Sequence, residues 1–147
     1  MPTVIVGDRI TLVKIHIFRL KPNTNLRGHL QTYARKNGFS AGLVLSIVGC
    51  LKEVNLRMAA ATPTKQIVKT YNEDFEIVST QGTLSANDCH IHISVSNKKG
   101  GVIGGHLKEG VVGTTTEVAL LELTDRKFLR KFDKETGFEE LIVETCI

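Results

Sequence analysis

Three histidines whose spacing would let them bind one metal ion lie in the second half of the chain, at His90, His92 and His106. Residues 89–96 alternate between polar and apolar side chains, which is typical of a β-strand. Successive side chains on a strand point to opposite faces, so His90 and His92 would share one face with Cα atoms about 7 Å apart. Two imidazoles at that spacing can converge on a zinc ion.

His106 follows across a Gly-rich turn predicted at residues 97–101. If the segments on either side of this turn pair with each other, His106 returns to the same end of the sheet as His92. A site with three histidines leaves one position of a tetrahedral zinc open for water or substrate, as in catalytic zinc sites. The same spacing also fits a half-polar strand face that binds no metal, and this alternative stays open.

Four residues near the histidines are candidates for supporting the metal or lining a ligand pocket. Gly104 and Gly105 precede His106 and are expected to give the backbone freedom to aim it, or to let another group approach closely. A bulged hairpin with no ligand is the alternative. Glu109 and Glu117 are candidates for a general base beside a metal-bound water, and the spacing selects neither of them.

Length and composition indicate one ordinary globular domain that spans residues 1–147. The net charge of +4 is spread along the chain, whereas a nucleic-acid-binding surface usually concentrates its positive charge. No apolar run is long enough for a membrane span. The chain has three cysteines and no CxxC pair, and its first residues do not resemble a signal peptide. These features predict an intracellular, cytoplasmic protein, and a nuclear location stays open.

Hydrophobic periodicity predicts an α+β fold: a largely antiparallel sheet of about seven strands with one main helix packed on it. Residues 10–20 are apolar on both faces and are expected to form an interior strand. Residues 111–123 are apolar and rich in threonine, which fits either a subunit-interface strand or a core strand. The helix is expected from Leu26 to Asn37, and the other strands at 39–58, 66–71, 75–84, 89–96, 118–123, 127–132 and 141–145.

An ordered series of motifs resembles the PPC (plant and prokaryote conserved) domain family, over about residues 9–144. The series comprises Phe75-Glu76-Ile77-Val78-Ser79, His90-Ile91-His92, Gly104-Gly105-His106-Leu107, Thr116-Glu117-Val118, Phe128-Leu129-Arg130 with Asp133, and Thr136-Gly137-Phe138-Glu139-Glu140-Leu141.

The resemblance implies an α+β domain that assembles as a homotrimer. It also implies a metal, zinc or a similar divalent ion, on His90, His92 and His106. Plant members carry AT-hooks before the domain and act as nuclear DNA-binding regulators. These 147 residues contain no AT-hook, which argues against direct DNA binding.

Two functional hypotheses follow. The first is a trimeric metal-binding domain that binds or processes a small polar ligand. The second is a DNA-associated or scaffold module, regulatory in role, in which the metal is structural. The sequence leaves open whether the protein is an enzyme, and it assigns no catalytic residue.

Overall fold

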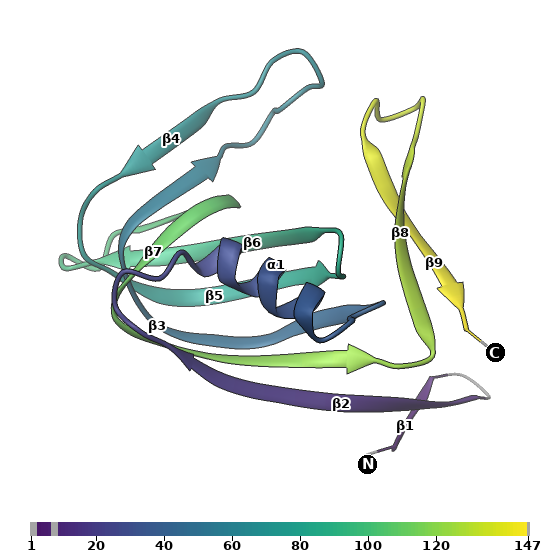
Figure 1. The fold of residues 1–147 in the computed structure, drawn as a ribbon. Coiled ribbons are helices and arrows are strands. Elements are labelled where there is room, and N and C mark those ends of the chain that lie inside the picture. Colours follow the sequence, from purple (N-terminus) through teal and green to yellow (C-terminus); the bar gives the residue numbers. More distant parts are fainter. Residues whose placement is uncertain (1–2, 7–8, 147) are drawn as a thin grey trace.

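The computed structural model describes residues 3–6 and 9–146, with side chains from Leu12 onward. This part of the chain contains one helix and nine strands (Figure 1). In chain order they are β1 (Thr3–Val6), β2 (Arg9–Leu20), α1 (Leu26–Lys36), β3 (Gly42–Arg57), β4 (Val68–Tyr71), β5 (Phe75–Leu84), β6 (Cys89–Asn97), β7 (Val102–Leu123), β8 (Arg126–Phe132) and β9 (Glu139–Thr145).

Strands β2 to β7 form one antiparallel sheet, which β1 extends at the start of β2. The order is β1-β2-β7-β6-β5-β3-β4, and a further pairing of β7 with β3 joins the two halves of the sheet. Strands β8 and β9 form a separate hairpin that stands beside the sheet (Figure 1). The predicted antiparallel sheet with one helix is confirmed. The class is mostly β rather than α+β, because the strands greatly outnumber the single helix.

The main difference from prediction is β7, which runs for 22 residues from Val102, whereas no strand was expected before residue 111 in this region. A bulged hairpin was one expectation for the segment with Gly104 and Gly105, yet both glycines lie inside the strand. The first part of β7 pairs with β6 and the second part with β2, while β3 pairs along most of its length. Because Val112, Val118 and Leu120 are buried, β7 is a core strand, one of the two predicted alternatives.

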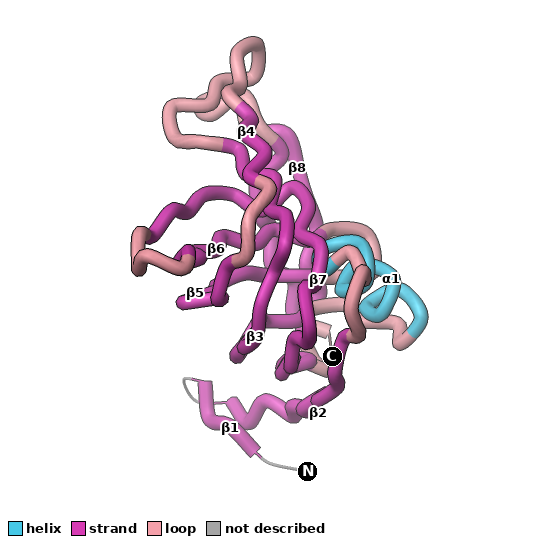
Figure 2. Tube along the Cα trace, turned by 90° about the vertical axis from the view of Figure 1, so that its left-hand side faces the viewer, coloured by secondary structure: helices cyan, strands magenta, loops and turns pink. Residues whose placement is uncertain are grey.

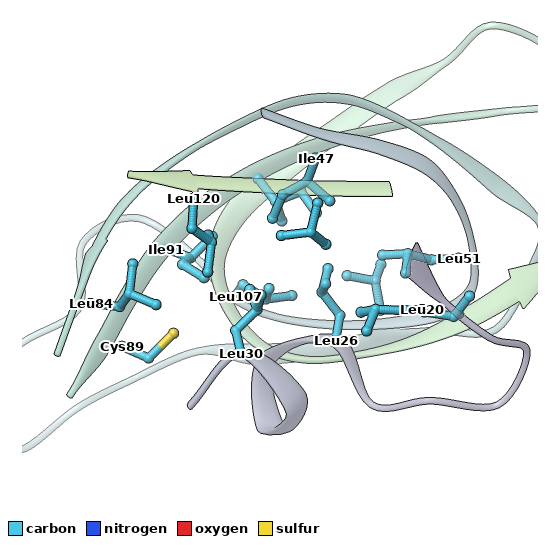
Figure 3. Close-up of a cluster of buried hydrophobic side chains, with 14 of the residues drawn as sticks. Leu20, Leu26, Leu30, Ile47, Leu51, Leu84, Cys89, Ile91, Leu107 and Leu120 are labelled. Atoms are coloured by element: carbon cyan, nitrogen blue, oxygen red, sulfur yellow. The ribbon is translucent and has the colours of Figure 1, made fainter. Parts of the chain in front are cut away.

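Helix α1 packs one apolar face on the inner side of the curved sheet (Figures 1 and 3). The Asn25 side chain caps its first turn by accepting a hydrogen bond from the Gly28 N–H at 2.9 Å. Leu26, Leu30 and Ala34, spaced for one helix face, are completely buried. Burying a leucine side chain contributes about 1.5–3 kcal/mol, so this face holds the helix on the sheet.

The prediction that residues 10–20 form an interior strand is wrong for one face of β2. Leu20 is buried on the inner face, but Ile15 is 52% and Ile17 77% exposed on the outer face. Val13 on the same face is buried, so the described part of the chain covers the outer face of β2 only at its start, and the stretch with Ile15 and Ile17 is open. A strand with two apolar faces suggests burial on both sides, but one copy of this chain supplies a cover for only one of them.

The β8–β9 hairpin reaches across to the loop that joins β3 and β4 (Figures 1 and 2). Gly137 in its turn lies so close to Pro63 that an added Cβ would be 2.7 Å from the Pro63 Cγ. Phe138 lies under the Arg57 guanidinium, whose central carbon is 5.9 Å from the ring centroid. The hairpin therefore lies against the end of β3 and covers it on one side.

No helix in the described residues is long and apolar enough to cross a membrane. The three cysteines are free: Cys89 is buried, Cys50 is half-buried and Cys146 is exposed.

Gly49 marks an irregularity in the β3–β7 register, and its replacement tests the close packing of these strands. Its φ is +144°, and an added Cβ would lie 2.2 Å from the Thr115 carbonyl oxygen. We expect Gly49→Ala to lower the free energy of unfolding by at least about 2 kcal/mol in urea denaturation. Gly100→Ala, at φ +79° in open space, is the control and should cost about 1–2 kcal/mol. Equal losses in the two variants would contradict this account.

Candidate metal centre

The pairing of β6 with β7 brings the three histidines together. His92 and His106 are directly opposite each other in the register, and His90 lies two residues earlier on β6. One ligand nitrogen from each ring lies within 4.8 Å of the other two. The Nε2 atoms of His90 and His92 are 3.3 Å apart. The three histidines therefore meet across the turn, as their spacing in the sequence predicted. Metal binding itself stays a prediction.

Burial of the alternate residues of β6 fixes the direction of its histidines. Cys89, Ile91 and Ile93 are buried in the core, so His90 and His92 must project to the other side. Strand β5 packs against this segment without room for a side chain at Gly82, where an added Cβ would lie 2.4 Å from the His90 carbonyl oxygen. The backbone of β6 is thus paired with β5 at both histidines, and from His92 onward it is paired with β7 as well.

Gly104 and Gly105 are required for space rather than for backbone freedom. Neither has a positive φ, so they do not aim His106 in the way the sequence analysis expected. An added Cβ at Gly104 would lie 2.8 Å from the Ile93 carbonyl oxygen, and one at Gly105 would lie 2.8 Å from the Arg57 carbonyl oxygen. The groups that approach these glycines closely are therefore the backbones of the neighbouring strands β6 and β3. Both glycines also line a shallow recess beside His92.

The structure does not bring the two candidate glutamates to the histidines. Glu109 is exposed and lies opposite Asn55. Glu117 is exposed farther along β7, eleven residues beyond His106, or about 36 Å at the usual rise of a strand. Neither glutamate lines a cavity that the described histidines line. The geometry therefore assigns no general base.

Two of the three imidazoles are held in the neutral form. Burial, followed by the positive charge of Arg57, lowers the pKa of His106 to about 3. Burial is also the main cause that lowers the pKa of His90, with smaller contributions from His92 and Arg130. Only a neutral imidazole has a lone pair for a metal, so this environment favours coordination. Three imidazole donors suit zinc or a similar borderline cation.

A cavity of about 370 Å³ adjoins His90 and His106. Two residues of its wall, Arg27 on α1 and Arg57 at the end of β3, carry no recognisable motif and could not be predicted from the sequence. Arg130 on β8 entered only as part of the family resemblance. The other residues that line the cavity are Asp88, Cys89, Phe138, Glu139 and Glu140.

Solved structures similar to this chain share its fold. A hypothetical protein from Salmonella cholerae-suis is 27% identical with a TM-score of 0.87, over 93% of this chain and 97% of that one. The metal-containing protein AF0104 from Archaeoglobus fulgidus is 27% identical with a TM-score of 0.79, over 88% and 93%. A candidate DNA-binding protein from Bacteroides thetaiotaomicron, with a TM-score of 0.77 over 96% of both chains, is only 19% identical and supports the fold alone.

A longer protein contains a similar segment. Bifunctional protein GlmU from Synechococcus sp. (strain JA-3-3Ab) is 34% identical over 133 residues, which cover 90% of this chain and 21% of that protein. The chain therefore spans about a fifth of the length of the curated relatives it matches.

The family comparison agrees with the motifs. The profile of the Plants and Prokaryotes Conserved (PCC) domain matches residues 9–124, whereas the resemblance in the motifs extended to residue 144 and so included the β8–β9 hairpin. The match covers the helix, strands β2 to β7 and all three histidines. This chain belongs to the Plants and Prokaryotes Conserved (PCC) domain family.

Proposed function

We propose that this chain is a single metal-binding domain that holds zinc or a similar divalent ion on His90, His92 and His106 and binds a small polar ligand beside it. The observation that carries the proposal is the meeting of three imidazoles at the edge of a cavity. A relative of the same fold, AF0104, is described as metal-containing, which supports the metal.

The donor set favours an exchangeable fourth ligand over a closed structural metal. Within the described residues the cluster contains only these three ligands, and a structural zinc usually has four from the protein. Two of the three histidines also line the cavity, so a small molecule can reach them. A bound divalent ion would supply a Lewis acid at this position. The chain's own contribution is to hold the imidazoles neutral and to enclose the ligand.

A DNA-associated or scaffold module with a structural metal is the alternative function. The name of the protein from Bacteroides thetaiotaomicron motivates it. A fourth protein ligand, or a continuous basic surface, would favour this alternative.

We further propose that the chain self-associates, as a homotrimer, through the outer face of its sheet. Ile15 and Ile17 on β2, and Leu45 and Val48 on β3, are each at least half exposed. Strand β7 lies between β2 and β3, so these side chains form one apolar patch across three strands. Large exposed apolar patches typically mark protein interfaces.

Metal analysis of protein purified without a histidine tag is the direct test of the metal site. We expect about one divalent ion per chain in the wild type, identified by mass spectrometry of the digested protein. His92→Ala should remove it, because two remaining imidazoles hold the ion much more weakly. His29→Ala, at an exposed position of α1, is the matched control and should keep the metal. Metal-free wild-type protein, or unchanged metal in His92→Ala, would refute the proposal.

The lowered pKa of His106 predicts a pH dependence of stability in the metal-free protein. Between about pH 6.5 and 3 the unfolded chain binds a proton at this histidine while the folded chain does not. The free energy of unfolding should therefore fall as the pH falls through this window. His106→Gln, measured by urea denaturation with chelator present, should flatten the slope, whereas His29→Gln should leave it as in the wild type. An unchanged slope in His106→Gln would contradict this prediction.

Light scattering coupled to size-exclusion chromatography tests the assembly. We expect the mass of a trimer for the wild type and of a monomer for Ile17→Lys, because a buried charge would oppose the contact. Val102→Lys alters another exposed apolar residue, at the start of β7 and outside this patch, and should remain trimeric. A monomeric wild type would exclude the trimer.

A further inference from the structure

We propose that the ligand of the cavity is a small oxyanion, with a carboxylate or phosphoryl group held by Arg27 and Arg57 beside the histidines. This inference rests on the proposed metal site, and it adds the chemical class of the ligand.

Three arginines from distant parts of the chain meet at this cavity. Arg27 comes from α1, Arg57 from the last residue of β3 and Arg130 from β8. Like charges gathered in one partly enclosed space repel one another unless an opposite charge compensates them. The guanidinium group presents a planar fork of donors that matches carboxylate and phosphate oxygens.

Only one of these three arginines forms an ion pair within the described residues. Arg130 donates from Nε to the Asp88 carboxylate at 2.7 Å. Neither Arg27 nor Arg57 forms an ion pair with any carboxylate of the described residues. The two arginines are therefore available to an anion that enters the cavity.

Arg27 also has a donor that nothing satisfies. One Nη2–H donates to the Cys89 carbonyl oxygen at 3.1 Å, which holds the guanidinium against β6. Its Nε atom is buried and has no hydrogen-bond partner in the described chain. Buried N–H groups without an acceptor are rare in folded proteins. Because Nε itself is buried, an anion in the cavity would be met by the terminal nitrogens of the guanidinium, which the bond to Cys89 holds at the cavity wall.

The position of Arg57 couples the anion to the metal. Its Nη2 donates to Nδ1 of His106 at 3.3 Å, because an arginine has no acceptor of its own. A metal on Nδ1 would use the same lone pair, and a metal on Nε2 would leave the proton on Nδ1. In both cases Nδ1 can no longer accept a hydrogen bond from Arg57, and the guanidinium is free to donate to an anion. Metal and anion should thus strengthen each other's binding.

The remaining walls restrict the size and charge of the ligand. A volume of about 370 Å³ lies near the lower end of the range for small-molecule pockets. The carboxylates of Glu139 and Glu140 also line the cavity and would repel a ligand that carries several negative charges. The geometry therefore favours one anionic group together with a hydrogen-bond donor, as in a hydroxy acid.

Binding of lactate, methylphosphonate and neutral lactamide to the zinc-loaded full chain tests the inference, measured by ligand-observed NMR. We expect lactate or methylphosphonate to bind at least about tenfold more tightly than lactamide, since only the charged probes pair with the guanidinium groups. Whichever charged probe binds more tightly identifies a carboxylate or a phosphoryl ligand. Arg27→Gln and Arg57→Gln should each weaken that binding at least about tenfold and leave the metal content unchanged.

Two further variants control for charge and folding. Arg35→Gln removes the same charge from an exposed position of α1 and should bind within about twofold of the wild type. Arg57→Lys keeps the charge but loses the planar fork, and should also bind the probe more weakly. Circular dichroism confirms that each variant is folded.

The metal content, measured on the same samples, separates the two proposals. The oxyanion inference would be overturned, with the metal site left standing, if metal-loaded protein bound neither charged probe. The same holds if Arg27→Gln and Arg57→Gln bound the probes as tightly as the wild type does. Wild-type protein without metal that still binds a charged probe through these arginines would overturn the metal site and support the oxyanion site. Protein without metal and without probe binding would overturn both.

Discussion

The antiparallel register between β6 and β7 is the constraint on which the candidate site depends. It sets His92 opposite His106, and the two-residue repeat of β6 then brings His90 to the same side. A slip of one residue would turn the histidines toward the core and the buried isoleucines toward solvent, so burial of Ile91 and Ile93 holds the register. Gly104 and Gly105 contribute by letting the flanking strands approach β7 closely.

The rest of the fold brings three arginines to this pair of strands. Helix α1 is anchored by its leucines and brings Arg27 to the cavity, while β3 ends there with Arg57. The β8–β9 hairpin adds Arg130 and places Phe138 under Arg57. Burial and these positive charges lower the pKa of His90 and His106, which keeps their lone pairs available. The same arginines supply the positive charge that an anionic ligand would meet.

The two faces of the sheet have different roles. The inner face packs on α1 and forms the core (Figure 3). The outer face leaves Ile17 and Val48 exposed to solvent in a single copy. An exposed row of large apolar side chains is costly in water, and association with further copies of the chain would remove that cost. The proposed assembly therefore explains why β2 is apolar on both faces although only one of them is buried.

The sequence by itself determined the elements that depend on local periodicity. The extent of α1, the alternation of β6 and the turn after it were all predictable, because each is specified by neighbouring residues. The shared side of His90 and His92 follows from the same alternation. The family could also be recognised from the motifs, and the match over residues 9–124 confirms it.

Tertiary structure decided what depends on contacts between distant segments. The continuity of β7 could not be predicted, since its glycines resemble turn residues until two neighbouring strands are seen to require them. Glu117 and His106 lie on one strand, yet its length separates them. Arg27 and Arg57 carry no local signal, because a guanidinium on a helix or at a strand end usually faces solvent. Only the packing of α1, β3 and the hairpin around the histidines brings these arginines into one cavity.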